Sequence, residues 1–185
     1  LALECPRVTA EPGRDGAILL PAQLTLTAPP TSDDRATAHV LARPERIAVL
    51  RRSVLLDSPA EEAFDRLTRL ASKIIGAPVS LVSLVDEDRQ FFKSCVGLPE
   101  PYASSRETPL SHSFCQHAVA TGEPLVIRDA REHPLVADNL AVPDLNVIAY
   151  AGIPLIVDGQ PLGSFCVIDG QPRQWTGEEI SILTD

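Results

Sequence analysis

A β-hairpin near the end of the chain constrains the fold more than any other feature of the sequence. Residues 147–169 form two apolar stretches that meet at Asp158-Gly159, and an Asp-Gly pair between two strands favours a tight hairpin turn. Upstream, strands are predicted over 79–85 and 90–96, on either side of an acidic turn. Strands joined by such short turns pair antiparallel, so the sequence predicts an antiparallel sheet.

Side chains alternate between the two faces of a strand, which divides the strand 90–96 into two sets. One face is predicted to carry Phe92, Ser94 and Val96, and the other Phe91, Lys93 and Cys95. Only one of the two adjacent phenylalanines can therefore line a pocket on a given face, and the other packs under helices.

Helices are predicted where apolar residues recur every three or four positions. The clearest one covers 60–75 and ends at Gly76, and its apolar face is expected to be buried: Ala63, Phe64, Leu67, Leu70, Ala71, Ile74 and Ile75. Another begins at Pro44 with Ile47, Leu50 and Val54 on one stripe. Capping boxes are predicted at three helix starts, formed by Ser58 with Glu61, Ser113 with Gln116, and Thr176 with Glu179. With a brief strand over 125–127, this order of elements predicts the α+β class.

Residues 1–43 are predicted to be a Pro-rich linker or an N-terminal extension. Five prolines interrupt this segment, and one apolar alternation over 18–26 is the only candidate strand within it. The chain lacks an initiating Met and stops at Asp185 inside a predicted helix. We therefore expect a piece of a larger protein, with a covalently linked output domain beyond Asp185.

The composition narrows the possible partners. A net charge of −9 argues against nucleic-acid binding, which needs a concentrated basic surface, and against docking on anionic lipid. No apolar run is long enough to span a membrane, and no secretory signal is present, so a cytoplasmic location is expected. The four cysteines, Cys5, Cys95, Cys115 and Cys166, are far apart, and this spacing is typical of neither a disulfide framework nor a zinc ribbon.

Several motifs occur in the order and spacing of a known family. The most distinctive is Ser113-Phe114-Cys115-Gln116-His117-Ala118-Val119, continued by 121–127. The other motifs lie at 55–65, 82–94, 150–155 and 162–169. Over residues 44–185 the chain closely resembles the GAF family of small-molecule sensor domains, and the run 108–115 is similar to that of bacterial members attached to signalling outputs.

The resemblance implies a fold and a role. A GAF domain would have a central antiparallel sheet of about six strands, terminal helices on one face, and a roof of loops and short helices over a ligand pocket on the other. In bacteria such domains commonly precede histidine kinases, diguanylate cyclases or PP2C-type phosphatases. The signature of cyclic-nucleotide-binding members is absent, and Gln116 separates Cys115 from His117 where bilin-binding relatives place Cys directly before His. The ligand and any cofactor are therefore left unspecified.

The ligand pocket is expected between the sheet and the irregular segment 109–150, because the helix 60–75 must cover the opposite face. The predicted ligand-binding residues are Phe91, Phe92, His112, Cys115, His117, Asp129, Asn139 and Tyr150. Each also has a structural interpretation: a buried thiol, a core aromatic ring, or an Asp or Asn that caps a turn. No catalytic residues and no metal ligands are predicted, since Cys115 and His117 point about 200° apart on a helix and the His and Cys residues match no ligand spacing.

The leading interpretation is a regulatory domain of a signal-transduction protein that senses a small molecule, forms a homodimer, and is not an enzyme. Dimerisation is expected through the terminal helices, over 43–56 and from 177 onward, because Val49 and Leu55 lie outside the stripe that packs on the sheet. Three alternatives are a redox or haem sensor that uses Cys115, Cys166 or a histidine, a ligand-free dimerising spacer, and a small enzyme.

Overall fold

The core of the protein is one antiparallel sheet of six strands in the order β3-β2-β1-β6-β5-β4. The computed structural model describes residues 32–185. The strands are β1 (Val79–Val85), β2 (Arg89–Val96), β3 (Glu107–Pro109), β4 (Leu125–Ile127), β5 (Ala149–Val157) and β6 (Gln160–Asp169). Asp158 and Gly159 connect β5 to β6 with positive φ angles of 50° and 73°, as a tight hairpin turn requires. The predicted α+β class, antiparallel sheet and hairpin are confirmed.

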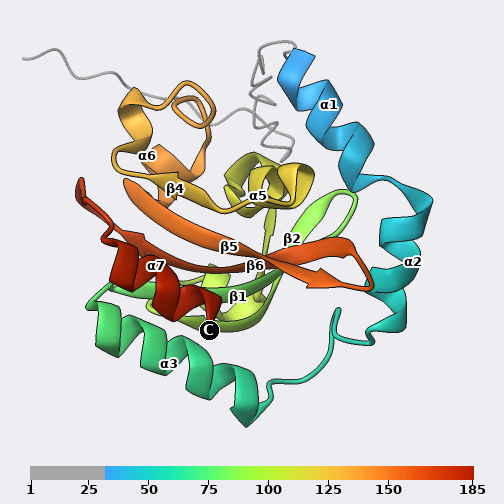
Figure 1. Cartoon of the computed structure of the whole chain (residues 1–185), viewed down its shortest axis with the longest axis horizontal. Coiled ribbons are helices and arrows are strands. Elements are labelled where there is room, and N and C mark those ends of the chain that lie inside the picture. The colour runs from blue at the N-terminus through green and yellow to red at the C-terminus, as the bar shows by residue number, and fades with distance from the viewer. Residues whose placement is uncertain (1–31) are drawn as a thin grey trace, which may run out of the picture.

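The helices divide between the two faces of the sheet (Figure 1). Helices α3 (Glu62–Ile75) and α7 (Gly177–Thr184) cover one face, and α5 (Cys115–Thr121) lies on the other. The second face also carries the short elements α4 (Tyr102–Ser105), η1 (Leu110–His112), η2 (Ala130–Glu132) and α6 (Ala141–Leu145). Helix α2 (Pro44–Arg52) packs Ile47 and Leu50 against Leu84 and Phe91, and α1 (Ser32–Leu41) contacts α5.

Helix α1 lies within the segment predicted to be a linker or extension. Its residues follow the last of the five prolines, so the helix-breaking pattern does not reach it. Leu41 at its end is fully buried in the core beneath the roof. The candidate strand over 18–26 lies outside the described residues.

A β-bulge at Lys93 changes which residues of β2 share a face. Phe92 pairs with Ser83 and Ser94 pairs with Val82, so Lys93 has no opposite residue on β1. The bulge places Ser94 on the α3 side, where its Oγ lies 2.8 Å from Thr68 Oγ1, and Cys95 on the roof side. The predicted alternation therefore holds through Lys93, whose ammonium lies 5.3 Å from the centre of the Phe64 ring of α3, and is wrong for Ser94 and Cys95.

The side chain of Lys93 explains why the capping box at α3 does not form. Its buried ammonium donates to Ser58 Oγ, to the Pro59 carbonyl and to Glu61 Oε1 at 2.5–2.7 Å. Both predicted capping residues are thus bound to Lys93, and α3 begins at Glu62 without a side-chain cap.

Of the other two predicted capping boxes, the one at α5 forms in part and the one at α7 forms in full. At α5, Ser113 Oγ accepts the Gln116 amide at 3.1 Å, but the Gln116 side chain donates to the Leu110 and Ser113 carbonyls instead of accepting an amide. At α7 both bonds of the capping box between Thr176 and Glu179 are present, which confirms the prediction.

Helix α3 buries only part of its apolar surface. Ala71 and Ile75 are buried and Phe64 is half-buried, whereas Leu67, Leu70 and Ile74 are 49%, 43% and 61% exposed. The prediction that the whole apolar set is buried is wrong, because a helix lying flat on a sheet covers one stripe and this set is wide enough for two.

The apolar surface expected on the entry helix is absent. Val49 is 7% exposed and Leu55 packs against the same cluster as Ile47 and Leu50. Val54 lies beyond the end of α2 and is 77% exposed. The premise for dimerisation through 43–56 is therefore wrong.

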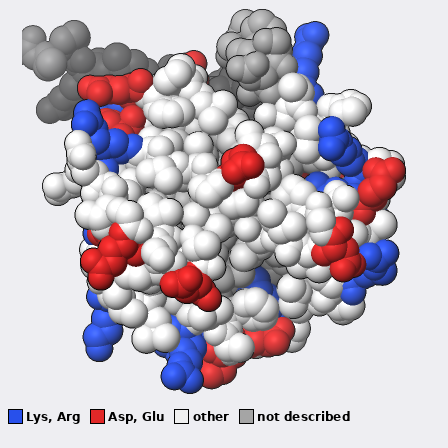
Figure 2. All heavy atoms as spheres, in the orientation of Figure 1, with Lys and Arg blue, Asp and Glu red and all other residues white. Residues whose placement is uncertain are grey.

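On the face shown in Figure 2, Lys and Arg side chains lie around the margin, interspersed with Asp and Glu, and acidic side chains also lie nearer the middle. Among the helices of residues 32–185, none is long and apolar enough to cross a membrane.

Candidate functional site

A small internal cavity lies between the sheet and its roof. Its volume is about 30 Å³, which is room for a water-sized molecule. The sheet supplies Leu81, Gln90, Phe92, Thr108, Tyr150 and Ile168, and the roof and its connections supply Leu98, His112, Phe114, Cys115, Ala141, Leu145 and Val147. The walls are mainly apolar, with a few polar groups from different elements, which is the usual composition of a ligand site.

Thr108 is the least satisfied polar residue in this cavity wall. It is 2% exposed, and its Oγ1 has no hydrogen-bond partner among the described residues. Neighbouring Gln90, its partner across β2 and β3, uses Oε1 to accept the Ser113 hydroxyl at 2.5 Å. A buried hydroxyl without a partner costs about 1–3 kcal/mol, so a polar guest beside Thr108 would be favoured.

His112 connects two parts of the roof. Its Nε2 lies 3.1 Å from Asp144 Oδ2 of α6, and its Nδ1 lies 3.0 Å from the hydroxyl of Ser111. Asn139 makes a second connection, because its Nδ2 donates to the Ser113 carbonyl at 3.2 Å and its Oδ1 accepts the Ala141 amide at 3.0 Å. These contacts hold η1, α5 and α6 together above the cavity.

Two thiols and two hydroxyls form a buried cluster at the junction of α5 with β5 and β6. The Tyr150 hydroxyl donates to Cys115 Sγ at 3.3 Å and lies 3.1 Å from Ser164 Oγ. Cys115 Sγ lies 3.9 Å from Cys166 Sγ. Burial is the main cause that raises the pKa of Tyr150 well above its ordinary value, so the phenol stays protonated and acts as a donor.

Four of the predicted ligand-binding residues line this cavity: Phe92, His112, Cys115 and Tyr150. Phe91 packs on the opposite face with α2, beneath the guanidinium of Arg106 at 4.9 Å. Asp129 does not line the cavity; it caps η2 and pairs with Arg131 at 2.6 Å. Asn139 is used in the roof contacts described above.

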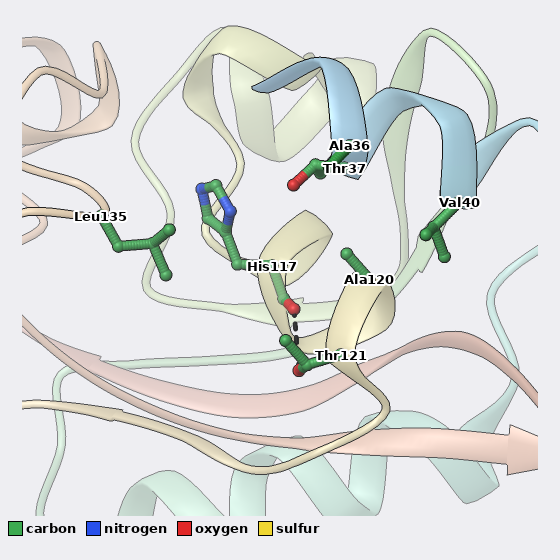
Figure 3. A pocket seen from close by; sticks show the side chains of 7 residues that line it. All are labelled: Ala36, Thr37, Val40, His117, Ala120, Thr121 and Leu135. Atoms are coloured by element: carbon green, nitrogen blue, oxygen red, sulfur yellow. Dashed lines mark hydrogen bonds between the residues drawn. The ribbon is translucent and has the colours of Figure 1, made fainter. Parts of the chain in front are cut away.

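His117 lies in a different hollow (Figure 3). Its side chain rises from α5, away from the strands, between Leu135 and Thr37 of α1. This open groove has a volume of about 260 Å³ and is otherwise lined by Ala36, Val40, Ala120 and Thr121. Thr121 Oγ1 donates to the His117 carbonyl at 3.0 Å, which is a contact within α5.

Gln90 and Thr108 line the cavity but were not predicted. Gln90 lies two residues before Phe92 on the same strand face, so alternation alone was enough to include it. Thr108 lies in β3, within a segment that reads as a Pro- and Ser-bearing loop, and only its pairing with β2 brings it to the cavity.

Metal binding by a side-chain cluster is not indicated in the part of the chain that the structure describes. Within residues 32–185, no group of three or more His, Cys, Asp or Glu side chains is placed to hold an ion.

The chain is similar to known proteins both in sequence and in fold. A family model described as GAF domain matches residues 59–185. The chain is 36% identical over 121 residues to the cyclic di-GMP phosphodiesterase PA2567 of Pseudomonas aeruginosa, which covers 64% of this chain and 20% of that protein. The chain therefore spans about a fifth of the length of that relative.

Solved structures share the fold at low sequence identity. The GAF domain of a phosphoenolpyruvate-protein phosphotransferase from Coxiella burnetii is 17% identical with a TM-score of 0.56, covering 75% of this chain and 86% of that one. The free methionine-R-sulfoxide reductase from Neisseria meningitidis, solved with its substrate, is 21% identical with a TM-score of 0.51, covering 77% and 90%. The fold is thus shared by a signalling domain and by an enzyme. The match of the family model over most of the chain shows that this protein belongs to the GAF domain family.

Proposed function

We propose that this GAF domain is a cytoplasmic regulatory module that binds a small polar molecule in the cavity between the sheet and the roof. The observation that carries the proposal is the buried Thr108 hydroxyl, which lines the cavity without a hydrogen-bond partner among the described residues. Polar side chains of Gln90, His112 and Tyr150 line the same space. The chain's similarity to part of a cyclic di-GMP phosphodiesterase supports a regulatory role with a linked output domain.

The size of the cavity predicts how binding acts. Sites for drug-sized ligands are roughly 300–1,000 Å³, about ten times the volume present here or more. Any ligand larger than a water-sized molecule must displace the roof, and the contacts of His112 with Asp144 and of Asn139 with Ser113 oppose this movement. Binding therefore selects a conformation in which the roof is open. The ligand then has a higher affinity for the open conformation than for the closed one, and a switch needs this difference.

A route from the cavity to the helices passes along β1. Leu81, the third residue of β1, lines the cavity, and the carbonyl of Val85, the last residue of β1, accepts a hydrogen bond from Arg46 of α2 at 2.7 Å. Arg46 also donates twice to the Leu41 carbonyl at the end of α1. A shift of β1 is thus passed directly to the α1–α2 junction.

The experiment is a thermal-shift screen with small polar molecules, starting from formate, nitrate, urea and acetamide. A ligand present at 100 times its Kd is expected to stabilise the parent protein by about 2.7 kcal/mol. Thr108→Val, which keeps the shape but removes the hydroxyl, is expected to weaken binding. Ser80→Ala is the matched control, because the Ser80 hydroxyl is also buried without a partner among the described residues but does not line the cavity.

Two results would count against the ligand proposal. One is that no compound stabilises the protein and none perturbs the amide NMR signals of residues 109–150. The other is that Thr108→Val and Ser80→Ala change binding equally. Either would favour the ligand-free dimerising spacer. We expect no catalytic turnover from the chain itself, and a reduction assay with free methionine sulfoxide checks the enzymatic alternative suggested by the shared fold.

Homodimerisation is a second candidate function, carried by the exposed stripe Leu67, Leu70 and Ile74 of α3. An apolar stripe of this kind marks a partner surface, and α3 packs beside α7 on the same face. Leu70→Glu is expected to weaken self-association in sedimentation velocity. Ile156→Glu, at an exposed apolar position of the β5–β6 hairpin, is the control and is expected to have no effect. A parent protein that is monomeric at high concentration would rule out this function.

A further inference from the structure

The fold brings together two cysteines that are 51 residues apart in the sequence. Cys115 is the first residue of α5, and Cys166 lies in β6, one of the two central strands of the sheet. Their sulfur atoms are 3.9 Å apart, and both side chains are buried. Cys95 is half-buried elsewhere in the core and is also a free thiol.

The surroundings of the two sulfurs make them chemically different. Hydrogen bonding from Cys166, opposed by burial and reinforced by Ser83, Tyr150 and Ser164, lowers the pKa of Cys115 to about 7. Burial is the main cause that raises the pKa of Cys166 well above its ordinary value. One sulfur is thus favoured as the thiolate, which is the reactive form, while the other keeps its proton.

The two sulfurs also differ in access. Cys115 lines the cavity between sheet and roof, whereas Cys166 lies behind it. A cavity of about 30 Å³ suits an oxidant close in size to water and is too small for a bulky disulfide such as glutathione disulfide.

We propose that Cys115 and Cys166 form a peroxide-reactive dithiol that closes to a disulfide between α5 and β6. The Cys115 thiolate attacks one oxygen of hydrogen peroxide, the O–O bond breaks, and the leaving hydroxide takes a proton to become water. Cys166 then attacks the sulfur of the resulting sulfenic acid, the S–O bond breaks, and the hydroxyl group leaves with the Cys166 proton as the second water. In total two thiols and one peroxide give one disulfide and two waters, and a dithiol reductant reverses the change.

Closure alters the wall of the cavity. A disulfide has an S–S length of about 2.05 Å, so the sulfurs must approach by about 1.9 Å from their present separation. This movement draws the start of α5 toward β6 and shifts the Cys115 sulfur that accepts the hydrogen bond of the Tyr150 hydroxyl. The consequence for ligand affinity rests on the proposed function, whereas the dithiol chemistry does not depend on it.

The test treats the reduced full chain with hydrogen peroxide, blocks the remaining thiols under denaturing conditions, and maps the peptides by mass spectrometry. We expect a peptide pair linked through Cys115 and Cys166, a loss of two hydrogens from the intact mass, and reversal by dithiothreitol. The linkage should form at least about tenfold faster than Cys95 is oxidised, because burial raises the pKa of Cys95. The variant that lacks both other thiols, Cys5→Ser with Cys95→Ser, should form the same disulfide at the same rate.

Two single substitutions order the steps. Cys166→Ser should stop the reaction at a sulfenic acid on Cys115 that dimedone traps, and Cys115→Ser should leave Cys166 unreacted. If peroxide oxidises Cys95 while Cys115 and Cys166 stay reduced, or if the crosslink joins another pair, the proposal is overturned, and this parent-chain result stands even where a single variant fails to fold.

Repeating the small-molecule screen on the oxidised protein separates the two proposals. A disulfide with no ligand in either redox state supports the dithiol and contradicts the ligand site. If a ligand binds the reduced protein but peroxide forms no disulfide, the ligand site is supported and the dithiol is contradicted.

Discussion

Gly152 of β5 allows the Tyr150 ring to lie over the sheet, and replacing it with alanine is the sharpest test of the site geometry. A Cβ at this position would be 2.2 Å from Tyr150 Oη, 2.5 Å from Tyr150 Cζ and 2.7 Å from Ser164 Oγ. The Ser164 hydroxyl can rotate, but the tyrosine ring is fully buried and has to be displaced.

The cost of Gly152→Ala follows from these contacts. Overpacking of a buried site costs about 1–3 kcal/mol. Displacing the ring also loses two hydrogen bonds of the Tyr150 hydroxyl, each worth about 1 kcal/mol. Alanine restricts the unfolded chain more than glycine does, and this offsets about 0.4–1 kcal/mol of the cost. The expected loss in the free energy of unfolding is therefore about 2–4 kcal/mol.

Urea unfolding followed by the fluorescence of Trp175, the single tryptophan, measures this free energy. Gly159→Ala is the control, since its Cβ meets nothing within 4 Å and only its φ of 73° is unfavourable. The control is expected to cost about 1 kcal/mol. In both variants the free energy of unfolding should fall with urea concentration at the same slope as in the parent protein.

A second background isolates the contact with the ring. Tyr150→Leu is destabilising by itself, but in that background Gly152→Ala should cost close to nothing, because the clashing atoms are gone. The coupling between the two substitutions is then at least about 2 kcal/mol. Additive effects, or a cost of Gly152→Ala no larger than that of the control, would show that the Tyr150 ring does not lie over Gly152.

Three further predictions concern other parts of the domain. Thr176→Ala removes the cap of α7 and should lower the free energy of unfolding by about 1 kcal/mol in the same urea assay, whereas an unchanged midpoint would contradict the capping geometry. Val54→Asn should stabilise the protein by up to about 1 kcal/mol, because an exposed β-branched residue with a φ of 57° is strained and Asn tolerates this region; a loss of stability would refute the strain. A hydrogen bond from Arg89 lowers the pKa of Asp57, so this pair adds stability above the unfolded pKa of about 3.9 that is lost as the pH falls through the folded pKa; Asp57→Asn should flatten the acid decline of Tm, and an unaltered pH profile would count against it.

Local chemistry in the sequence was sufficient for much of the fold. The turn at Asp158-Gly159 and the capping box of Thr176 and Glu179 depend on residues at most three positions apart, and both formed as predicted. The antiparallel sheet followed from strands joined by short turns, for the same reason. Where a candidate cap had a distant competitor, the prediction was wrong: Lys93 binds both Ser58 and Glu61, more than 30 residues away in sequence.

Only the tertiary structure decided the composition of the site. The bulge at Lys93 reverses the faces of the residues after it. The alternation of residue types along a strand does not reveal such a register shift, so the bulge could not be predicted from the sequence. Apolar periodicity likewise predicts that α3 has an apolar face, but it does not predict how much of that face the sheet can cover. The exposure of Leu70 could therefore not be predicted from the sequence. The contact of Cys115 with Cys166 requires α5 to pack on β6, a pairing across 51 residues that no spacing rule encodes. Sequence patterns report what neighbouring residues prefer, whereas a cavity and a thiol pair arise from contacts between distant segments, and these are set by how the whole chain packs.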